Sequence, residues 1–264
     1  MYPFVTIFSR SIGVYQIAIL FGIFATGIYV CRLCKKNGYD DNDGIHFLLL
    51  SSIGVFVGGH ILYSLVNYQI FINIIKNISY IDSLQKFLKA VHLIWGGNIF
   101  YGGLVGGLLA AFIILKKIPR YRYLLDFVTP AIPLFHFFGR IGCFFAGCCF
   151  GIESSFGFIF HHSIVEEANG VYRFPVQLLE AVINLLLFFT LDFFRRKNIF
   201  NNNIIYMYLL FYSIARFFIE FMRGDAYRGF FIIFSTSQII SLIIFIIVIS
   251  KIYIIYRYKN TSDN

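Results

Sequence analysis

Charged and sulfur-containing side chains interrupt the otherwise apolar stretch "HFFGRIGCFFAGCCFG", which runs from His136 to Gly151. An ionisable side chain at the centre of a membrane-spanning helix costs at least about 2.5 kcal/mol and is a functional hypothesis by default. Arg140 lies well inside this stretch, and His136 precedes it by one helical turn on the same face. A guanidinium group matches the geometry of phosphate with two parallel hydrogen bonds. Arg140 therefore predicts a site for an anion.

A second group of charges lies in "YSIARFFIEFMRGD", where Arg216, Glu220 and Arg223 have the spacing i, i+4, i+7. This spacing places all three on one side of a helix. Since Glu220 neutralises one arginine only, the two groups together predict a surplus of positive charge, and an anion is the economical partner. The alternative is structural: the arginines pair with Glu180 and Glu220, or Arg223 reaches the membrane edge.

The composition indicates which elements must hold these residues. The chain has 264 residues, of which 59% are hydrophobic and 13% charged, with a mean hydropathy of +0.77, far from the range of soluble domains. Its apolar stretches are long enough, as helices, to cross a hydrocarbon core of about 30 Å. We therefore expect one all-α integral membrane domain over residues 1–264, with about seven transmembrane helices. The expected spans are Ile12–Cys31, Ile45–Tyr68, Asn98–Leu115, Leu124–Phe150, Phe174–Phe194, Ile204–Phe221 and Phe230–Ile249.

Basic residues gather in alternate loops, in "CRLCKKNGYDDNDG", "KKIPRYR" and "RRKN". The positive-inside tendency places these loops in the cytoplasm, with the N-terminus outside and the C-terminus cytoplasmic. Contact of such loops with anionic head groups accounts for the net charge of +9, so we expect no nucleic-acid partner. The segment between Gln69 and Gly97 contains "IDSLQKFLKAVHLIW", whose apolar residues have the spacing of an amphipathic helix, and we expect it along the outer interface. No convincing cleavage site follows the first span, which is expected to be retained.

Glycine is concentrated in "GGNIFYGGLVGG", which runs from Gly96 to Gly107. Small residues let helices, or a lipid head group, approach the backbone closely. Close helix packing is the commoner cause of such a pattern. Tyr101, in the middle of the stretch, is polar enough to donate a hydrogen bond in a pocket.

Five ordered segments resemble motifs of the bacterial prolipoprotein diacylglyceryl transferases, and the resemblance covers most of the chain. "GRIGCFFAGCCFG" is similar to the family's arginine-centred signature, and "YGGLVGG" to its glycine-rich motif. "RFPVQLLEA" looks like the Pro-x-Gln-Leu-Tyr-Glu motif, and "ARFFIEFMRGD" like the Arg-x-x-x-Glu-x-x-Arg motif near the end. "GVYQIAILFG" fits the first-span segment, with Tyr15 at the tyrosine position.

The resemblance implies a multi-pass enzyme of the bacterial plasma membrane, a seven-helix bundle whose site opens toward the outer leaflet. It implies transfer of the diacylglyceryl group of phosphatidylglycerol to the cysteine thiol of a prolipoprotein signal peptide, with release of glycerol phosphate. The implied partners are phosphatidylglycerol, prolipoprotein signal peptides and membrane lipids, with no cofactor and no metal. Carried over by position, Arg140 and Arg216 hold the phosphate and Glu220 and Arg223 order the site. Tyr15, Gln177 and Glu180 complete the expected phospholipid-binding set.

The chain departs from the family pattern at positions that bear on how the proton of the acceptor thiol is removed. Tyr101 stands where the pattern has a histidine, Cys143 where it has asparagine, Cys148 where it has glutamate, and His60 where it has arginine. Family members from Gram-positive anaerobes look similar at "GRIGCF" and "GCC", which predicts a cysteine-rich subfamily.

The acceptor thiol must become a thiolate, because the thiol itself is a poor nucleophile. Our candidate base is His136, whose neutral form is favoured by the charge of Arg140. A histidine satisfied by its helix neighbours is an equal alternative, and Tyr101 orienting the head group is a third. The expected catalytic residues are thus His136, Tyr101 and Arg140.

The five cysteines offer weaker signals. Cys31 and Cys34 form a CxxC without a second pair nearby, which is poor support for a metal or redox site. Cys143, Cys148 and Cys149 are expected to behave as small hydrophobic residues; the alternative is that they report on redox state or transiently accept a lipid.

Two rival functions share the same arginines. One is a carrier that binds an anion or phospholipid without breaking a bond, and the other is a transferase of the same fold with a different acceptor. They differ from the first hypothesis in the products that they predict.

Overall fold

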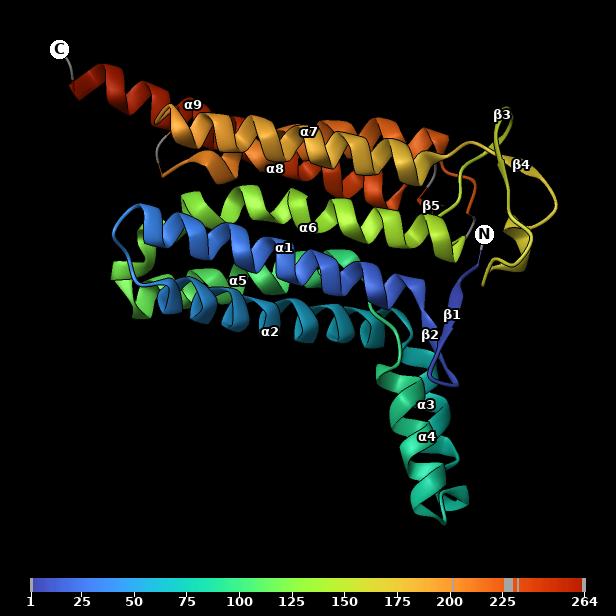
Figure 1. The fold of residues 1–264 in the computed structure, drawn as a ribbon. Coiled ribbons are helices and arrows are strands. Elements are labelled where there is room, and N and C mark those ends of the chain that lie inside the picture. Colours follow the sequence, from blue (N-terminus) through green and yellow to red (C-terminus); the bar gives the residue numbers. More distant parts are fainter. Residues whose placement is uncertain (1, 201, 226–229, 232, 263–264) are drawn as a thin grey trace. The chain divides into compact units, whose positions relative to one another are not determined.

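The computed structural model describes residues 2–200, 202–225, 230–231 and 233–262 (Figure 1). The chain divides into two compact units, which are described separately below. Unit 1 comprises Met1–Leu33 and Leu125–Asn264, and unit 2 comprises Cys34–Leu124. The expectation of one domain over the whole chain stays a prediction.

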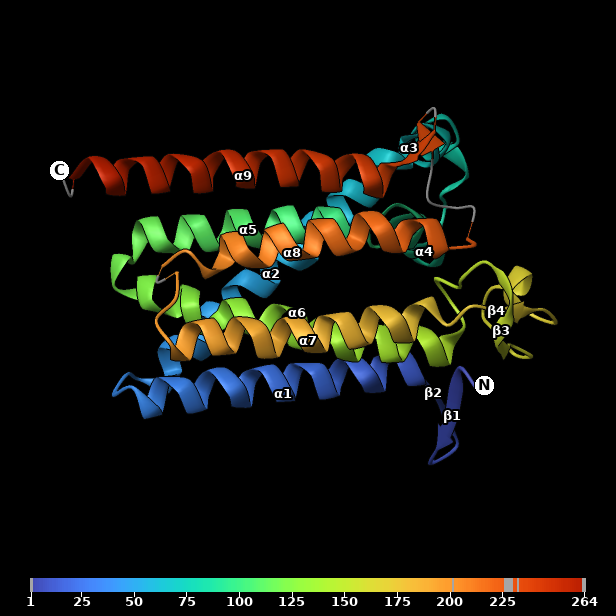
Figure 2. The ribbon, with the colours of Figure 1, turned by 90° about the horizontal axis from the view of Figure 1, so that it is seen from above.

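Unit 1 is built on long apolar helices. They are α1 (Val14–Lys36), α6 (Leu124–Ala146), α7 (Val176–Arg196), α8 (Ile204–Ile219) and α9 (Thr236–Ser262). Helix α7 packs against α8, and α8 packs against α9, with their axes running alongside one another (Figure 2). Polar side chains are buried between these helices, among them Gln177, Glu180 and Arg216. Burial of such groups in an apolar bundle requires partners, and these partners define the site below.

Short strands in unit 1 correct the all-α expectation. Three antiparallel two-stranded sheets pair β1 (Phe4–Ile7) with β2 (Arg10–Gly13), β3 (Glu153–Ile159) with β4 (Tyr172–Arg173), and β5 (Phe230–Phe231) with β6 (Phe234–Ser235). Two predicted spans therefore begin later than expected, at Val14 and Thr236. The segment between β3 and β4 also holds the short 3-10 helix η3 (Glu166–Ala168).

The fourth predicted span ends earlier than expected. Helix α6 stops at Ala146 and not at Phe150, because Gly147 adopts a φ of +76°, a left-handed conformation that ends a helix.

Unit 2 contains α2 (Asp41–Val66), α3 (Tyr68–Lys76), η1 (Ile78–Tyr80), α4 (Leu84–Trp95), α5 (Phe100–Lys117) and η2 (Pro119–Tyr123). Helices α2 and α5 cross closely at their glycines. A Cβ atom on Gly102 would collide with the carbonyl oxygen of Gly58, and one on Gly106 with that of Gly54. Within this unit the glycine-rich stretch therefore serves close helix packing.

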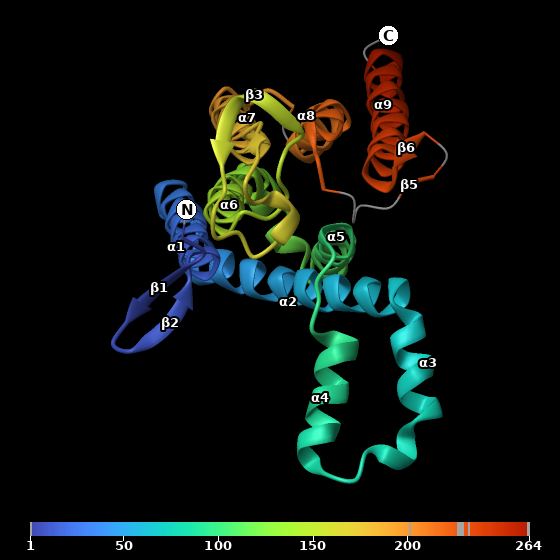
Figure 3. The ribbon, with the colours of Figure 1, turned by 90° about the vertical axis from the view of Figure 1, so that its right-hand side faces the viewer.

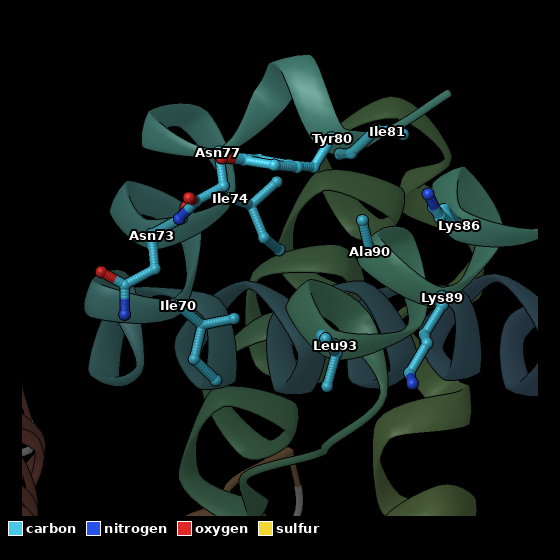
Figure 4. Close-up of a pocket in the computed structure, with 10 residues that line it drawn as sticks. All are labelled: Ile70, Asn73, Ile74, Asn77, Tyr80, Ile81, Lys86, Lys89, Ala90 and Leu93. Carbon is cyan, nitrogen blue, oxygen red and sulfur yellow. The ribbon is translucent and has the colours of Figure 1, made fainter. Parts of the chain in front are cut away.

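The helix predicted within residues 81–95 is present as α4, and a second short helix, α3, precedes it. Helices α3 and α4 form a hairpin that extends away from α2, crosswise to its axis (Figure 3). The Ser83 side chain caps α4 by accepting a hydrogen bond from the backbone N–H of Lys86. A shallow groove of about 440 Å³ lies between the two helices (Figure 4). The residues that line it are Ile70, Asn73, Ile74, Asn77, Tyr80, Ile81, Lys86, Lys89, Ala90 and Leu93.

Six helical segments among the described residues are long and apolar enough to cross a membrane. They are Val14–Lys36, Asp41–Val66, Pro119–Ala146, Val176–Arg196, Ile204–Met222 and Thr236–Ile255. Each overlaps a predicted span. The remaining prediction, Asn98–Leu115, coincides with α5, whose 18 residues extend for about 27 Å, just short of a typical hydrocarbon core. The count of seven and the orientation stay predictions.

Candidate active site

Three helices of unit 1 bring Arg140, Glu180 and Arg216 together. On α6, Arg140 places Nη2 2.9 Å from Oε1 of Glu180, which lies on α7. On α8, Arg216 places Nη1 3.4 Å from Oε2 of the same carboxylate. The Glu180 side chain is only 2% exposed, so it is a buried charge held between two guanidinium groups. Arg140 and Arg216 thus converge on one centre, as the phosphate hypothesis requires.

Arg216 has two further partners. Its Nη2 lies 2.9 Å from Oε2 of Glu220, one helical turn further on, and donates a hydrogen bond of 3.4 Å to Oγ of Ser237 at the start of α9. Glu220 opens the short 3-10 helix η4 (Glu220–Met222), with which α8 ends. The predicted i, i+4 relationship of Arg216 and Glu220 is confirmed. Ser237 was not predicted, since no spacing along α8 points to another helix.

Arg223 pairs with a residue that the sequence reasoning missed. Its Nε and Nη2 donate to the two oxygens of Asp225, at 3.0 and 2.6 Å. Burial lowers the pKa of the Arg223 guanidinium, but the hydrogen bonds to Asp225 outweigh this effect and hold the pKa above its ordinary value. The Arg223 side chain is 8% exposed, so it does not extend freely into water. The signal in the sequence that could have predicted this pair is Asp225 itself, an acidic residue two positions after Arg223.

The charges of this cluster balance, and the expected positive surplus is wrong. Arg140, Arg216 and Arg223 face Glu180, Glu220 and Asp225, three formal positive charges against three negative ones. The surplus was inferred because Glu220 alone was counted as a partner. Burial explains the difference: an unpaired guanidinium in this bundle would cost several kcal/mol. An incoming anion therefore has to share guanidinium donors with a carboxylate, or take them over.

His136 lies on α6 one turn before Arg140. Its ring centroid is 5.4 Å from that of Tyr212 on α8, and its side chain also interacts with Asn184 on α7. These neighbours hold the histidine within the bundle, which agrees with the structural alternative. The structure places His136 in the same cluster as Arg140 and leaves its role as a base untested.

Gln177 lies at the start of α7 and is 1% exposed. Its Nε2 donates a hydrogen bond of 2.8 Å to the carbonyl oxygen of Cys148. Its Oε1 is buried and has no hydrogen-bond partner among the residues that the structure describes. A buried acceptor without a partner is costly, so this atom is suited to receive an N–H or O–H of a bound molecule.

The other expected residues fall in different places. Tyr15 on α1 packs beside Gly142 of α6, where a Cβ atom would come within 3.1 Å of the tyrosine ring, and it lies within electrostatic reach of Arg140. Tyr101 lies on α5 in unit 2. His60 lies on α2 of the same unit, and its ring stacks with that of Trp95, with the centroids 5.9 Å apart. Tyr15 thus joins the unit 1 site, and Tyr101 belongs to the other unit.

Two loops of unit 1 are paired by their backbones beside the arginines. The Ile152 N–H donates to the Met222 carbonyl at 3.0 Å, and the Gly224 N–H donates to the Phe150 carbonyl at 2.9 Å. This ladder holds Arg223 next to the turn that carries the cysteines. The sulfur atoms of Cys143, Cys148 and Cys149 all lie within 4.8 Å of one another, and all three thiols are free of disulfides.

Long apolar helices around a buried arginine and carboxylate network define a multi-pass membrane protein with a site suited to a phosphate-bearing lipid. The chain matches the family described as "Prolipoprotein diacylglyceryl transferase" over residues 3–255. It therefore belongs to this family of membrane enzymes and is a diacylglyceryl transferase, as the motifs predicted.

Curated relatives extend the match to nearly full length. A phosphatidylglycerol–prolipoprotein diacylglyceryl transferase of Clostridium tetani is 33% identical over 245 residues, covering 91% of this chain and 92% of the relative. A second, from Clostridium perfringens, is also 33% identical and covers 91% of this chain and 90% of its own length. A third, from Aeromonas hydrophila, is 33% identical over 262 residues, with coverages of 96% and 90%.

Proposed function

We propose that this chain transfers the diacylglyceryl group of phosphatidylglycerol to the lipobox cysteine of prolipoproteins, with Arg140 and Arg216 holding the phosphate. The observation that supports these roles is the shared carboxylate: two guanidinium groups from separate helices converge on Glu180 at 2.9 and 3.4 Å. The names of the relatives support the two substrates.

The reaction needs the leaving phosphate to be stabilised. The acceptor sulfur forms a bond to the glyceryl carbon, the bond from that carbon to the phosphate oxygen breaks, and glycerol phosphate leaves with the electron pair. Guanidinium groups that are already oriented in a water-poor site stabilise this developing charge without reorganising. We assign the orienting role to Glu180 and Glu220, which hold the planes of Arg140 and Arg216 in place. Arg223, which forms an ion pair with Asp225, lies at the outer end of the cluster.

Gln177 and Tyr15 complete the proposed lipid site. Gln177 presents a buried carbonyl oxygen beside the cysteine turn, where it can accept from a head-group hydroxyl or a peptide N–H. Tyr15 stands on α1 at the edge of the same cluster and is 41% exposed, so part of this residue is accessible to a lipid arriving from the side.

Two roles stay predictions: that of His136 as the base, and that of Tyr101 as a residue that orients the head group. His136 is buried beside Tyr212, one turn from Arg140, which agrees equally with a structural role. We further propose a bacterial plasma membrane location with the N-terminus outside, and a cysteine-rich branch of the family, on the strength of the "GRIGCF" and "GCC" segments.

The decisive experiment uses the full chain reconstituted in vesicles. Labelled phosphatidylglycerol and a lipobox peptide are added, and the products are separated. We expect a thioether-linked diacylglyceryl peptide and an equal amount of glycerol phosphate. Binding of the lipid without either product would favour the carrier, and transfer to another acceptor would favour the related transferase.

A further inference from the structure

The turn after α6 gathers three thiols that the phosphate site does not use. Cys143 lies in the last turn of α6, and Cys148 and Cys149 follow the left-handed Gly147. Cys149 itself has a φ of +53°, an uncommon conformation for a residue with a side chain. These two left-handed residues fold the chain back, so that all three sulfur atoms lie within 4.8 Å of one another. Uncommon backbone conformations of this kind gather at functional sites.

The spacing of the sulfur atoms suits a tetrahedral metal ion. Zinc–sulfur bonds of about 2.3 Å place thiolates about 3.8 Å apart, so small side-chain rotations bring the three sulfur atoms into position. Among the described residues, this is the one group of three or more His, Cys, Asp or Glu side chains found close enough to hold a metal. Three thiolates alone leave a fourth position open, which is the arrangement of catalytic zinc sites and not of closed structural ones.

The surroundings of the three thiols fit a bound ion. Gln177 donates to the Cys148 carbonyl at 2.8 Å, so an outer partner holds the backbone of one ligand. Zinc with three thiolates carries one net negative charge. The positive charges of Arg140 and Arg223 both act on Cys149 and would offset it.

We propose that Cys143, Cys148 and Cys149 bind one zinc ion whose open fourth position receives the acceptor thiol of the prolipoprotein. This proposal rests on the transfer proposed above and names the means by which its nucleophile is made. A thiol that coordinates zinc is deprotonated outright. The three protein thiols release their protons when the metal binds. The acceptor thiol then loses its proton to water at this partly exposed turn, its sulfur attacks the glyceryl carbon, and the phosphate leaves toward Arg140 and Arg216. The neutral thioether binds zinc weakly and departs.

The position of the cysteines supports this role. The ladder between Phe150–Ile152 and Met222–Gly224 holds the cysteine turn next to Arg223, inside the arginine cluster. A nucleophile formed at the turn is therefore close to the donors that receive the leaving group.

Metal binding is tested on the purified full chain, reduced, stripped with a chelator and dialysed against zinc. We expect about one zinc ion per chain by elemental analysis. The variant C143S/C148S/C149S should lose it, while C31S/C34S, the matched control, should retain it. If the triple variant does not fold, C148S and C149S alone, at half-buried positions, should each weaken zinc affinity at least about 10- to 100-fold. No bound zinc, zinc retained by the triple variant, or copper held in its place would overturn the assignment.

The open position is tested with cobalt in place of zinc. Thiolate-to-cobalt charge transfer should appear in the wild type, and a lipobox peptide should change the visible cobalt bands only when its cysteine is present and not when that residue is serine. Zinc should also raise the transfer rate of the stripped enzyme on the order of ten-fold or more, because only a few per cent of a free thiol is ionised at pH 7. Cobalt bands that do not change when the cysteine-containing peptide is added, or full activity without metal, would overturn the proposal. A chain that binds zinc through these thiols but forms no thioether would instead overturn the proposed transfer.

Discussion

Arg140 and Arg216 bind one carboxylate, that of Glu180, from two different helices. The shared carboxylate orients both guanidinium groups toward one point. There their N–H groups can donate to a phosphate in place of the carboxylate with little motion.

Replacing Arg140 tests the phosphate role. R140A is expected to lower the transfer rate on the order of 10²- to 10³-fold, the usual loss when one preorganised donor to a developing anion is removed. R140K keeps the charge and loses the paired geometry, so its rate should fall between those of R140A and the wild type. The assay is release of glycerol phosphate. R120A is the matched control, since Arg120 is 73% exposed and pairs with Asp43 at the surface; normal activity of R140A would remove Arg140 from the site.

Replacing Glu180 tests whether the shared carboxylate is needed for stability. E180Q preserves the shape and removes the charge that compensates two buried guanidinium groups, so we expect a loss of about 3–5 kcal/mol in unfolding free energy. Unfolding in detergent, followed by circular dichroism, measures it. D82N breaks the exposed pair between Asp82 and Lys86 and should cost about 0.3–0.5 kcal/mol. Equal losses for the two variants would contradict the network.

Replacing His136 separates two ways of making the thiolate. If His136 is the base, H136Q should lower the rate about 10²- to 10⁴-fold and remove one limb of the pH profile. If zinc at the cysteine turn supplies the thiolate, H136Q should keep the rate within a few-fold and leave the pH profile unchanged. Rates measured across a pH series with a saturating lipobox peptide distinguish these outcomes. The protein's unfolding temperature is the control for a merely structural defect.

Replacing Gly106 tests the close crossing of α2 and α5. A methyl group on Gly106 meets the Gly54 backbone, so G106A should destabilise the chain by about 1–3 kcal/mol through overpacking. G27A is the control, because a Cβ atom at Gly27 has nothing within 4 Å and alanine favours a helix. A neutral G106A would show that the glycines do not serve this crossing and would restore the head-group interpretation.

Helix periodicity made part of the site predictable. It placed Arg216 and Glu220 one turn apart, and the apolar stretches located six long helices. The partners between helices were not predictable, since nothing in a linear pattern says that Glu180 faces α6 and α8 at once. The charge balance was consequently misjudged.

Irregular backbone explains what else was missed. Arg223 and Asp225 meet because the chain leaves helical geometry after η4, where no period applies. Strands β5 and β6 are largely apolar and continue the hydropathy of α9, so they were assigned to its span, whereas the hairpin before α1 overlaps the first predicted span only at Ile12 and Gly13. The cysteine cluster depends on left-handed backbone at Gly147 and Cys149, which residue types alone do not reveal.

The backbone ladder between Phe150–Ile152 and Met222–Gly224 has a mechanical consequence. It joins the segment that leaves α6 to the segment that leaves α8, so neither can be displaced without pulling on the other. A lipid that moves Arg223 to enter the cluster must therefore also shift the turn bearing the sulfur atoms. Binding of the lipid would then be coupled to the position of the turn that prepares the acceptor thiol. The coupling would run through three consecutive residues on each side of the ladder.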